Sequence, residues 1–504
     1  MELFIIRRAW LDAEILVDGS PLTVAGEVYT LPEAARAVLA YNAIPDGMPF
    51  VLSANAAYEP TVSEWLLSLP GNGFPSENTW SSYGRDAVVF GRFLREVRGK
   101  TLLEADADDI RTYYRARRIT SAKPLSASSW NRAVYALESF YERAVDMELI
   151  QKPPFSYRKA KASSLHQRYV KAGVVNAALE NVGSGLKIKC ITLDDYLKFR
   201  DIGLRGLLPD GTCDPEFRGR NGLRNSAIAE SMVGTGIRLS ECSWMLLAEL
   251  PDPTAPQWNG FRACKMQLAK PTTKGIKGRV IWFPMRVLRE YVRPYIREDR
   301  GNQVSKSSDR GLYRTVRDTI RVTAWRSTDC VIATLAGRER RGYDALTQDQ
   351  RRRMFSIDRE GMITEPGLLW LSESGMGIDG GNIEKFFERA CERCLRFGIH
   401  LYVTPHILRH TFAVYMLSHL IKEAIGGLPE VRRQKQSLDQ RLYREMFTDP
   451  LRTLQRLLGH ASYITTFDYL TYIEEAEDFV EKAVASWGDR LGPPSEFLAG
   501  DTVE

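Results

Sequence analysis

The sequence predicts a multidomain protein that is mainly α-helical with a small β-sheet, in which an all-α domain precedes a mixed α/β domain. Three observations lead to this fold class. The 504 residues exceed the roughly 250–300 at which a single core stops growing. Apolar residues recur at three- and four-residue steps over much of the chain. Two short runs, "FRACKMQLA" and "RVIWFP", instead have the composition of β-strands.

Composition places the chain among ordinary folded proteins. Hydrophobic residues make up 44% and charged residues 26%. No run of about 18 apolar residues exists to span a bilayer, and the start "MELFIIRRAWLDAE" does not resemble a signal peptide. The seven cysteines are few and scattered, which favours reduced thiols. We therefore expect a cytoplasmic protein with no membrane partner.

Charge is unevenly distributed along the chain. The formal net charge is +6, but residues 474–504 carry −7, so the preceding residues carry +13. A basic body followed by an acidic tail favours a polyanionic partner such as nucleic acid.

The first 155 residues divide into two parts. Residues 1–58 mix short strand-like runs with one helical piece, and we assign this N-terminal extension no role. Residues 59–155 are expected to form a small all-α domain. Its first long helix is marked by apolar residues at helical spacing, namely Trp80, Tyr83, Ala87, Phe90, Leu94 and Val97. Its second is "SSWNRAVYALESFYERAVDM", closed by "QKPPF".

A basic, polar segment at 156–184 is predicted to be an exposed interdomain linker. The mixed domain follows at 185–473. It opens with a helix that Thr192 is placed to cap, and continues with a helix–turn–helix in "NSAIAESMVGTGIRLSECSWMLLAEL". The two strands flank the turn segment "KPTTKGIKG". The stretch 297–365 stands out by its irregular pattern.

Two patterns in the sequence resemble metal sites only weakly. "CERC" at 391–394 has no second Cys or His pair at metal spacing and fits helix packing. His406 and His410 stand four residues apart, as in zinc sites of the H-E-x-x-H type, but Ile407 occupies the place of the glutamate base. We therefore expect no metal and no cofactor.

The same histidines also fit a phosphate pocket. Only six histidines occur in the chain, and two of them flank Arg409 in "HILRHTFA". A further arginine, Arg238, follows the glycine-rich turn of "GTGIRLSE", and His460 ends "LLGH". Arginine forks suit non-bridging phosphate oxygens, and a nearby tyrosine can attack phosphorus without a metal ion.

These three segments resemble the signature boxes of the tyrosine recombinase (phage integrase) family, whose order is Arg, Lys, His-x-x-Arg, His and Tyr. In that family the nucleophile lies nine residues after the histidine of the Leu-Gly-His box. This spacing indicates Tyr469, whereas Tyr463 comes too early and Tyr472, the remaining rival, three residues too late. The family's lysine corresponds to Lys274 in the hairpin turn, with Lys277 as a substitute.

The resemblance implies a catalytic set in which each residue has a role. Arg238 and Arg409 would hold the phosphate oxygens, Lys274 would protonate the leaving 5′-oxygen, His406 would help to take the phenol proton, His460 would donate to the phosphate, and Tyr469 would attack to form a 3′-phosphotyrosyl link. His410 would only fix the helix beside the site. Residues 59–155 would be the helical core-binding (SAM-like) domain and 185–473 the catalytic domain. Against the family pattern the catalytic domain would carry two insertions, near 297–365 and near 422–450, and the second lengthens the distance from Arg409 to His460 to 51 residues.

Partners and alternatives follow from the same resemblance. A clamp on duplex DNA with specific recombination sites is expected, assembled as a homo-tetramer, for integration or excision of a mobile element; any accessory protein is left unknown. The acidic tail at 474–504 would dock either on its own body or on a neighbour. Two other functions stay open, namely DNA relaxation like that of type IB topoisomerases and non-catalytic DNA-binding regulation.

Overall fold

The fold is that of a computed structural model in which the chain forms two compact units, Met1–Ser184 and Gly185–Glu504. Each unit is described by itself. The residues that the structure describes are 1–6, 16–17, 20–21, 23–24, 27–28, 44–45, 47–53, 55–74, 76–159, 174–180, 189–273, 277–316, 318–334, 337–426, 449–460, 464–467 and 469.

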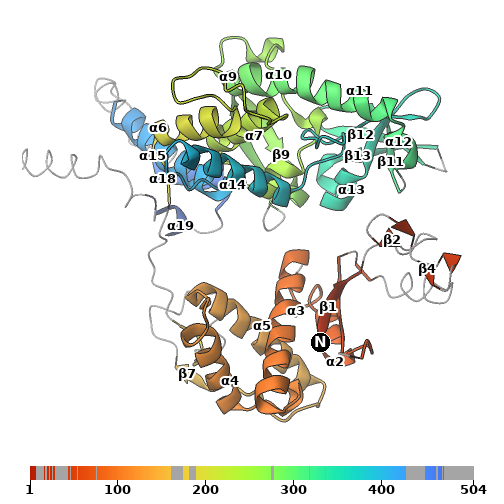
Figure 1. The fold of residues 1–504 in the computed structure, drawn as a ribbon, viewed down its shortest axis with the longest axis vertical. Coiled ribbons are helices and arrows are strands. Elements are labelled where there is room, and N and C mark those ends of the chain that lie inside the picture. The colour runs from red at the N-terminus through yellow and green to blue at the C-terminus, as the bar shows by residue number, and fades with distance from the viewer. Residues whose placement is uncertain are drawn as a thin grey trace, which may run out of the picture. The chain divides into compact units, whose positions relative to one another are not determined.

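The first unit is built around four helices (Figure 1). They are α2 (Pro60–Ser68), α3 (Glu77–Phe93), α4 (Ala107–Tyr114) and α5 (Ala127–Asp146). Wider turns extend α3 over Leu94–Arg98 and α4 over Arg115–Ile119, and a short 3₁₀ turn covers Leu102–Glu104. The helix predicted from "SSWNRAVYALESFYERAVDM" is α5, which begins and ends one residue earlier than that segment, so this prediction is confirmed.

The apolar stripes of these helices meet in one aromatic core. Trp65 and Trp130 are each 1% exposed, and Phe90 and Phe140 are equally well buried. Each indole N–H has an acceptor: Trp65 donates to Ser139 Oγ over 3.2 Å and Trp130 donates to the Ala178 carbonyl over 2.8 Å. The helical spacing read from the sequence is therefore the spacing of core residues.

Short strands join this core from both flanks. β1 (Glu2–Ile5) pairs antiparallel with β6 (Pro49–Leu52), and Val51 is fully buried. β7 (Tyr157–Lys159) pairs antiparallel with β8 (Val174–Asn176). Between β1 and β6 in the sequence, the chain forms two small antiparallel ribbons: β2 (Leu16–Val17) with β3 (Ser20–Pro21), and β4 (Thr23–Val24) with β5 (Glu27–Val28).

Of the described ends of the predicted linker, residues 156–159 are exposed and include β7, whereas residues 174–180 pack on the first unit. Leu179 is 8% exposed and belongs to the core of the first unit. Arg118 Nε and Nη2 both donate to the Glu180 carboxylate over 2.6 Å. Buried aliphatic contact and a two-pronged ion pair hold this segment on α4 and α5, which the polar composition of 156–184 did not indicate.

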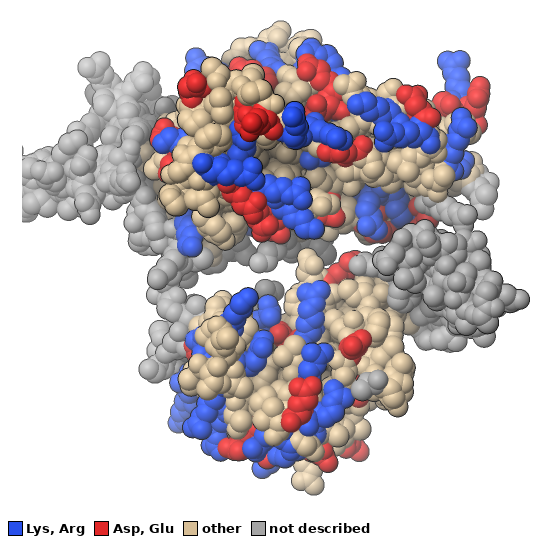
Figure 2. Space-filling view, viewed as in Figure 1, with Lys and Arg blue, Asp and Glu red and all other residues tan. Residues whose placement is uncertain are grey.

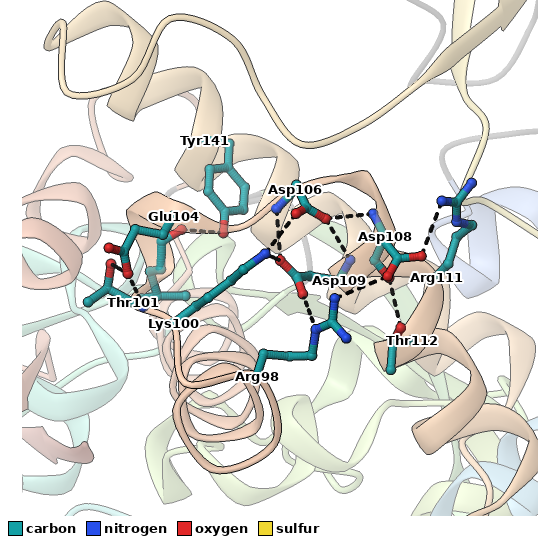
Figure 3. Close-up of polar contacts among 11 residues, drawn as sticks. Arg98, Lys100, Thr101, Glu104, Asp106, Asp108, Asp109, Arg111, Thr112 and Tyr141 are labelled. Carbon is teal, nitrogen blue, oxygen red and sulfur yellow. Dashed lines mark hydrogen bonds and ion pairs between the residues drawn. The ribbon is translucent and has the colours of Figure 1, made fainter.

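A polar network fixes the start of α4 (Figure 3). Asp109 is fully buried and accepts from Arg98 Nε over 2.5 Å, from Lys100 Nζ over 2.7 Å and from the Asp106 main-chain N–H over 3.0 Å. Asp106 in turn caps the helix through the N–H groups of Asp108 and Asp109. Hydrogen bonds from Lys100 and the helix N–H groups lower the pKa of Asp106 to about 2.

Asp109→Ala is therefore expected to destabilise the first unit by about 1–3 kcal/mol, because it removes the shared acceptor of two partly buried cations and one helix cap. Asp108→Ala is the matched control. Asp108 is 55% exposed and also pairs with Arg98, so its loss should cost no more than about 1 kcal/mol. Urea unfolding followed by circular dichroism measures both; equal losses in the two variants would contradict the role given to Asp109.

The second unit surrounds a two-stranded hairpin with helices (Figure 1). The hairpin is β9 (Ala263–Leu268) with β10 (Arg279–Pro284). Its helices are α6 (Leu193–Lys198), α7 (Gly222–Thr235), α8 (Leu239–Ser243), α9 (Met285–Val287), α10 (Arg293–Tyr295), α11 (Gly301–Asp309), α12 (Leu312–Thr315), α13 (Gln348–Arg352), α14 (Gly380–Arg396), α15 (Pro405–Gly426), α18 (Pro450–Leu458) and α19 (Ile464–Phe467).

Wider or tighter helical turns complete these elements, at Phe199–Leu204, Leu247–Glu249, Pro256–Trp258, Lys270–Thr272, Leu288–Val292, Ile296–Arg300 and Tyr343–Ala345. Thr192 Oγ1 accepts the Asp195 N–H over 3.1 Å and so caps α6 as predicted. α7 lies at the centre of the main core, with Ile228 and Met232 fully buried. The mainly α fold with small sheets is confirmed.

The stretch 297–365, which the sequence presents as irregular, contains a five-stranded sheet. Its order is β13–β12–β11–β14–β15, formed by β13 (Gly337–Gly342), β12 (Asp329–Thr334), β11 (Ile320–Trp325), β14 (Met354–Ile357) and β15 (Ile363–Pro366). Only the β11–β14 pairing is parallel. The fully buried Arg351 ties the sheet to the body by donating to both Glu249 carboxylate oxygens, over 2.8 and 2.9 Å.

Several predicted features lie outside the described residues, or only partly within them. The second insertion, 422–450, is described only at its ends, and the tail at 474–504 is not described at all. Cys391 and Cys394 lie on α14, and the seven cysteines form no disulfide. Across the described ranges, no helix has the length and apolarity that crossing a bilayer requires.

Candidate active site

The turn before Arg238 depends on a glycine. α7 ends at Thr235, and Gly236 takes a left-handed conformation with φ +66°. A Cβ at Gly236 would lie 2.3 Å from the Phe412 ring on α15, so only glycine lets the two helices approach this closely. The turn then delivers Arg238 to the N-terminus of α8.

Arg238 is held by an acid three residues on. Its main-chain N–H donates to Glu241 Oε2 over 2.7 Å, and its Nη1 donates to Oε1 over 3.0 Å. Its Nη2 donates to the Gly459 carbonyl over 3.3 Å. The guanidinium thus links the start of α8 to the turn after α18, and its side chain stays 22% exposed.

Arg409 lies deeper, on α15, and is 3% exposed. It donates to the Gly236 carbonyl through Nη1 and to the Leu458 carbonyl through Nη2 over 2.5 Å. The second arginine of the predicted pair therefore meets the same turn of α18 as the first. Residues 171 positions apart in the sequence converge here, as the predicted phosphate pocket requires.

His460 follows a second left-handed glycine. α18 ends at Leu458 and Gly459 has φ +63°. The His460 Nδ1 lies 3.0 Å from Thr466 Oγ1, and its ring stacks against Tyr469 with centroids 6.0 Å apart and planes 9° apart. The predicted nucleophile is thus in contact with the predicted histidine.

Tyr469 itself is 2% exposed, and its hydroxyl lies 2.8 Å from His410 Nδ1. This corrects the expectation that His410 only fixes the helix beside the site. His406, which we expected near the phenol proton, is exposed on the preceding turn of α15, and its ring centroid lies 4.2 Å from that of His410. The structure thus places His410 in contact with both the phenol and the His406 ring.

Three predicted residues cannot be placed. Lys274, Tyr463 and Tyr472 lie outside the described residues. Arg238, Arg409, His460 and Tyr469 are brought together.

Sequence reasoning missed two charged residues of this cluster, Glu241 and Arg279. Both Nη atoms of Arg279 donate to the Glu241 carboxylate, with Nη2 at 2.7 Å. The Glu241 side chain is buried, at 1% exposed. Two signals could have found them. Glu241 stands at the capping-box spacing from Arg238. Arg279 lies two and four residues before Ile281 and Phe283, so the two-residue period of a strand puts all three on the inward face of β10.

The cluster carries more buried positive charge than negative. Burial, followed by repulsion from Arg238 and Arg279, lowers the pKa of Arg409 to about 9. Burial, followed by repulsion from Arg409 and Arg238, lowers the pKa of His460 to about 3. Groups that repel one another in this way gain from a bound anion, which supplies the missing negative charge.

A pH prediction arises from His410. Burial, then the positive charges of His406 and Arg409, lower its pKa to about 4, against about 6.5 in an unfolded chain. Between these values the unfolded chain binds the extra proton, so the stabilising effect of neutral His410 is complete above about pH 6.5 and is lost as the pH falls towards 4.

His410→Gln should therefore flatten the dependence of the unfolding free energy on pH by up to about 1.4 kcal/mol per pH unit near pH 5. His460, with its lower pKa, leaves a remaining slope in the variant. Urea unfolding of both proteins from pH 4 to 7 measures the difference; parallel curves would contradict the protonation state assigned to His410.

Among the residues that the structure describes, no group of three or more His, Cys, Asp or Glu side chains could hold a metal ion.

Comparison with known proteins identifies relatives. Residues 62–148 match the family described as "Phage integrase, N-terminal SAM-like domain". A tyrosine recombinase XerC of Pediococcus pentosaceus is 30% identical over 172 residues, which cover 33% of this chain and 45% of the relative. The alignment thus spans less than half the length of that relative.

Solved structures of XerH site-specific recombinase bound to difH substrate and of a lambda integrase dimer bound to a COC′ core site are also similar. The first is 13% identical with a TM-score of 0.41, covering 84% of this chain and 85% of that one. The second is 14% identical with a TM-score of 0.41, covering 81% and 93%. By the family match and the XerC relative, residues 62–148 are a phage integrase N-terminal SAM-like domain and the chain is a homologue of the tyrosine recombinases.

Proposed function

We propose that the chain is a site-specific recombinase that cleaves and rejoins duplex DNA in the cytoplasm through a 3′-phosphotyrosyl intermediate on Tyr469. The observation that carries this proposal is the meeting of Arg238, Arg409 and His460 at the end of α18, beside the hydrogen bond between Tyr469 and His410. Integration or excision of a mobile element is the setting that the family resemblance suggests.

The two arginines form the proposed phosphate seat. At the end of α18 they donate to the neutral carbonyl oxygens of Leu458 and Gly459. A phosphodiester carries a full negative charge and accepts stronger, shorter hydrogen bonds than a carbonyl does. We therefore assign the non-bridging oxygens of the scissile phosphate to Arg238 and Arg409, with His460 as a further donor.

The chemical step is a transesterification. The Tyr469 oxygen bonds to phosphorus, and the bond from phosphorus to the 5′-oxygen breaks. The leaving 5′-oxygen takes a proton, and we assign the donation of this proton to Lys274. Charge builds on the non-bridging oxygens, where preorganised cations stabilise it. The product ester is as energy-rich as the original, so the reverse attack by a 5′-hydroxyl rejoins a strand without a further energy source.

The phenol proton leaves through histidine. His410 Nδ1, at 2.8 Å from the Tyr469 hydroxyl, is the first acceptor, and the ring of exposed His406 beside it is placed to pass the proton towards solvent. A phosphate bound nearby would raise the pKa of His410 from about 4, because negative charge favours the imidazolium form. His406 thus keeps its proposed part in the proton's removal and shares it with His410.

Duplex binding is proposed to involve both units. On α3, Arg85 and Arg92 are exposed and seven residues apart, so they share a face of the helix, with Arg95 close to it. Figure 2 shows basic side chains over α3 and in patches on the second unit, interleaved with acidic ones. Phosphate contacts of this kind would make binding salt-dependent. Strand exchange between two sites would require four protomers.

The proposal is tested by covalent capture. The full-length chain is incubated with a nicked duplex library of random sequence, and DNA that stays bound in detergent is recovered and sequenced. A shared sequence among the captured duplexes is expected. Absence of any detergent-resistant DNA would contradict the proposed cleavage, and relaxation of supercoiled plasmid without sequence preference would instead favour the topoisomerase alternative.

Cleavage is expected to be independent of divalent metal, because arginine, lysine and histidine side chains carry the charge stabilisation in this scheme. Adduct formation on a captured duplex should keep its rate, within about twofold, in excess EDTA. Loss of adducts under chelation and their return with magnesium or zinc would contradict the scheme.

A further inference from the structure

Three consecutive carbonyl oxygens at the end of α18 each accept a hydrogen bond from a different arginine. Leu457 O accepts from Arg279 Nε over 2.9 Å, Leu458 O from Arg409 Nη2 over 2.5 Å, and Gly459 O from Arg238 Nη2 over 3.3 Å. The last carbonyls of a helix lack helical partners and carry the negative end of its dipole. The three arginines come from β10, α15 and the start of α8.

Arg279 differs from the other two in its surroundings. It is 9% exposed on the inward face of β10, and both Nη atoms donate to Glu241 while Nε donates to Leu457 O. Its fork is thus occupied by a buried carboxylate rather than by neutral carbonyl oxygens alone. Such a guanidinium is placed to hold other groups, not to receive a phosphate.

Glu241 is the group that Arg279 shares with the proposed phosphate seat. The same carboxylate accepts from Arg279, from Arg238 Nη1 and from the Arg238 main-chain N–H. A carboxylate bound on one side by a rigid arginine fork presents its remaining acceptor positions in a fixed direction. Arg279 therefore determines, through Glu241, where the Arg238 guanidinium lies.

The turn that carries His460 also rests on Arg279. A Cβ on Gly459 would lie 2.8 Å from Arg279 Cδ, so the glycine turn packs directly on the arginine stem. Together with the Leu457 hydrogen bond, this contact fixes the end of α18 immediately before His460.

We propose that Arg279 is a positioning residue for the phosphoryl transfer: it aligns Arg238 through Glu241 and His460 through the end of α18. The inference rests on the proposed function and adds to it a residue outside the predicted catalytic set. Misplacement of a phosphate-binding group by about 1 Å costs on the order of 100-fold in rate. Lysine at 279 keeps the charge but cannot bind the carboxylate with two nitrogens and Leu457 O with a third.

The test compares two substrates. A duplex captured by the wild-type chain is synthesised in two versions. One has the natural phosphate at the scissile position, and the other has a methylphosphonate, which lacks the negative charge that Arg238 is proposed to hold. Arg279→Lys should slow adduct formation at saturating protein on the order of 10–100-fold on the phosphate. The same variant should slow adduct formation on the methylphosphonate far less. The protein concentration that gives the half-maximal rate should stay within about threefold of the wild-type value.

The matched control is Arg351→Lys. Arg351 is also buried and paired through both Nη atoms with one glutamate, Glu249, but it holds the inserted sheet. Arg351→Lys should lower thermal stability. If it slows adduct formation, the factor should be the same on both substrates. Glu241→Gln, which keeps the shape of the side chain, serves as the second variant and covers the case in which Arg279→Lys fails to fold.

Charge-dependent loss in Arg279→Lys or Glu241→Gln, absent from Arg351→Lys, supports the positioning role. Wild-type rates in both site variants, or an equal loss on the two substrates, overturns it. A wild-type chain that forms no adduct on the natural phosphate contradicts the proposed function, and this inference with it.

Discussion

Replacing Tyr469 by phenylalanine is expected to abolish covalent protein–DNA adducts while duplex binding stays near that of the wild type. The substitution removes only the oxygen proposed to bond to phosphorus, and the ring keeps its stacking on His460. Folding should suffer little, since one hydrogen bond to His410 is worth about 0.5–1.5 kcal/mol. Gel electrophoresis in detergent with labelled duplex measures the adduct, and a mobility shift measures binding.

Tyr472→Phe is the matched control, because Tyr472 is the rival three residues on. It should form adducts at the wild-type rate. Adducts in Tyr469→Phe together with their absence in Tyr472→Phe would reverse the assignment.

Arg238→Ala is expected to slow adduct formation on the order of 10²–10³-fold, the cost of removing one preorganised donor from a transition-state site. The partly exposed guanidinium joins Glu241 to the turn before His460, so its loss also leaves the buried carboxylate with one arginine instead of two. Because Arg279 still neutralises Glu241, the chain should remain folded.

Arg297→Ala provides the comparison. Arg297 is 76% exposed and forms an ion pair with its neighbour Glu298, over 2.7 Å. Single-turnover rates at saturating protein should separate the two variants by at least about tenfold. Equal rates would show that Arg238 does not stabilise the reacting phosphate.

Much of the helical fold was predictable because periodic burial leaves a periodic sequence. The α5 segment and the Thr192 cap both appear where apolar spacing and capping chemistry placed them. The five-stranded sheet was not predictable in this way. Its edge strand β13 reads "GRERRG" and is almost wholly exposed, so alternation between a buried and a solvent face is missing there.

The site shows the same division. The resemblance of three short motifs to the family's signature boxes predicted Arg238, Arg409, His460 and Tyr469 as site residues, and the structure brings these four together. The hydrogen bond from Tyr469 to His410 spans 59 residues and the ion pair from Arg279 to Glu241 spans 38. The contact of His410 with the phenol depends on how α15 packs against α18, and a single sequence does not specify that packing.

The central claim, that Tyr469 carries the DNA, is tested most directly by locating the covalent bond. Adduct formed by the full-length wild-type chain on a captured duplex is digested with nuclease and protease, and the peptide that retains a nucleotide is sequenced by mass spectrometry. The account predicts a 3′-linked nucleotide on the tyrosine of the peptide containing "TTFDY", that is, on Tyr469. A nucleotide on Tyr472, on Tyr463 or on any serine, or a linkage to the 5′ end of the DNA, would contradict it.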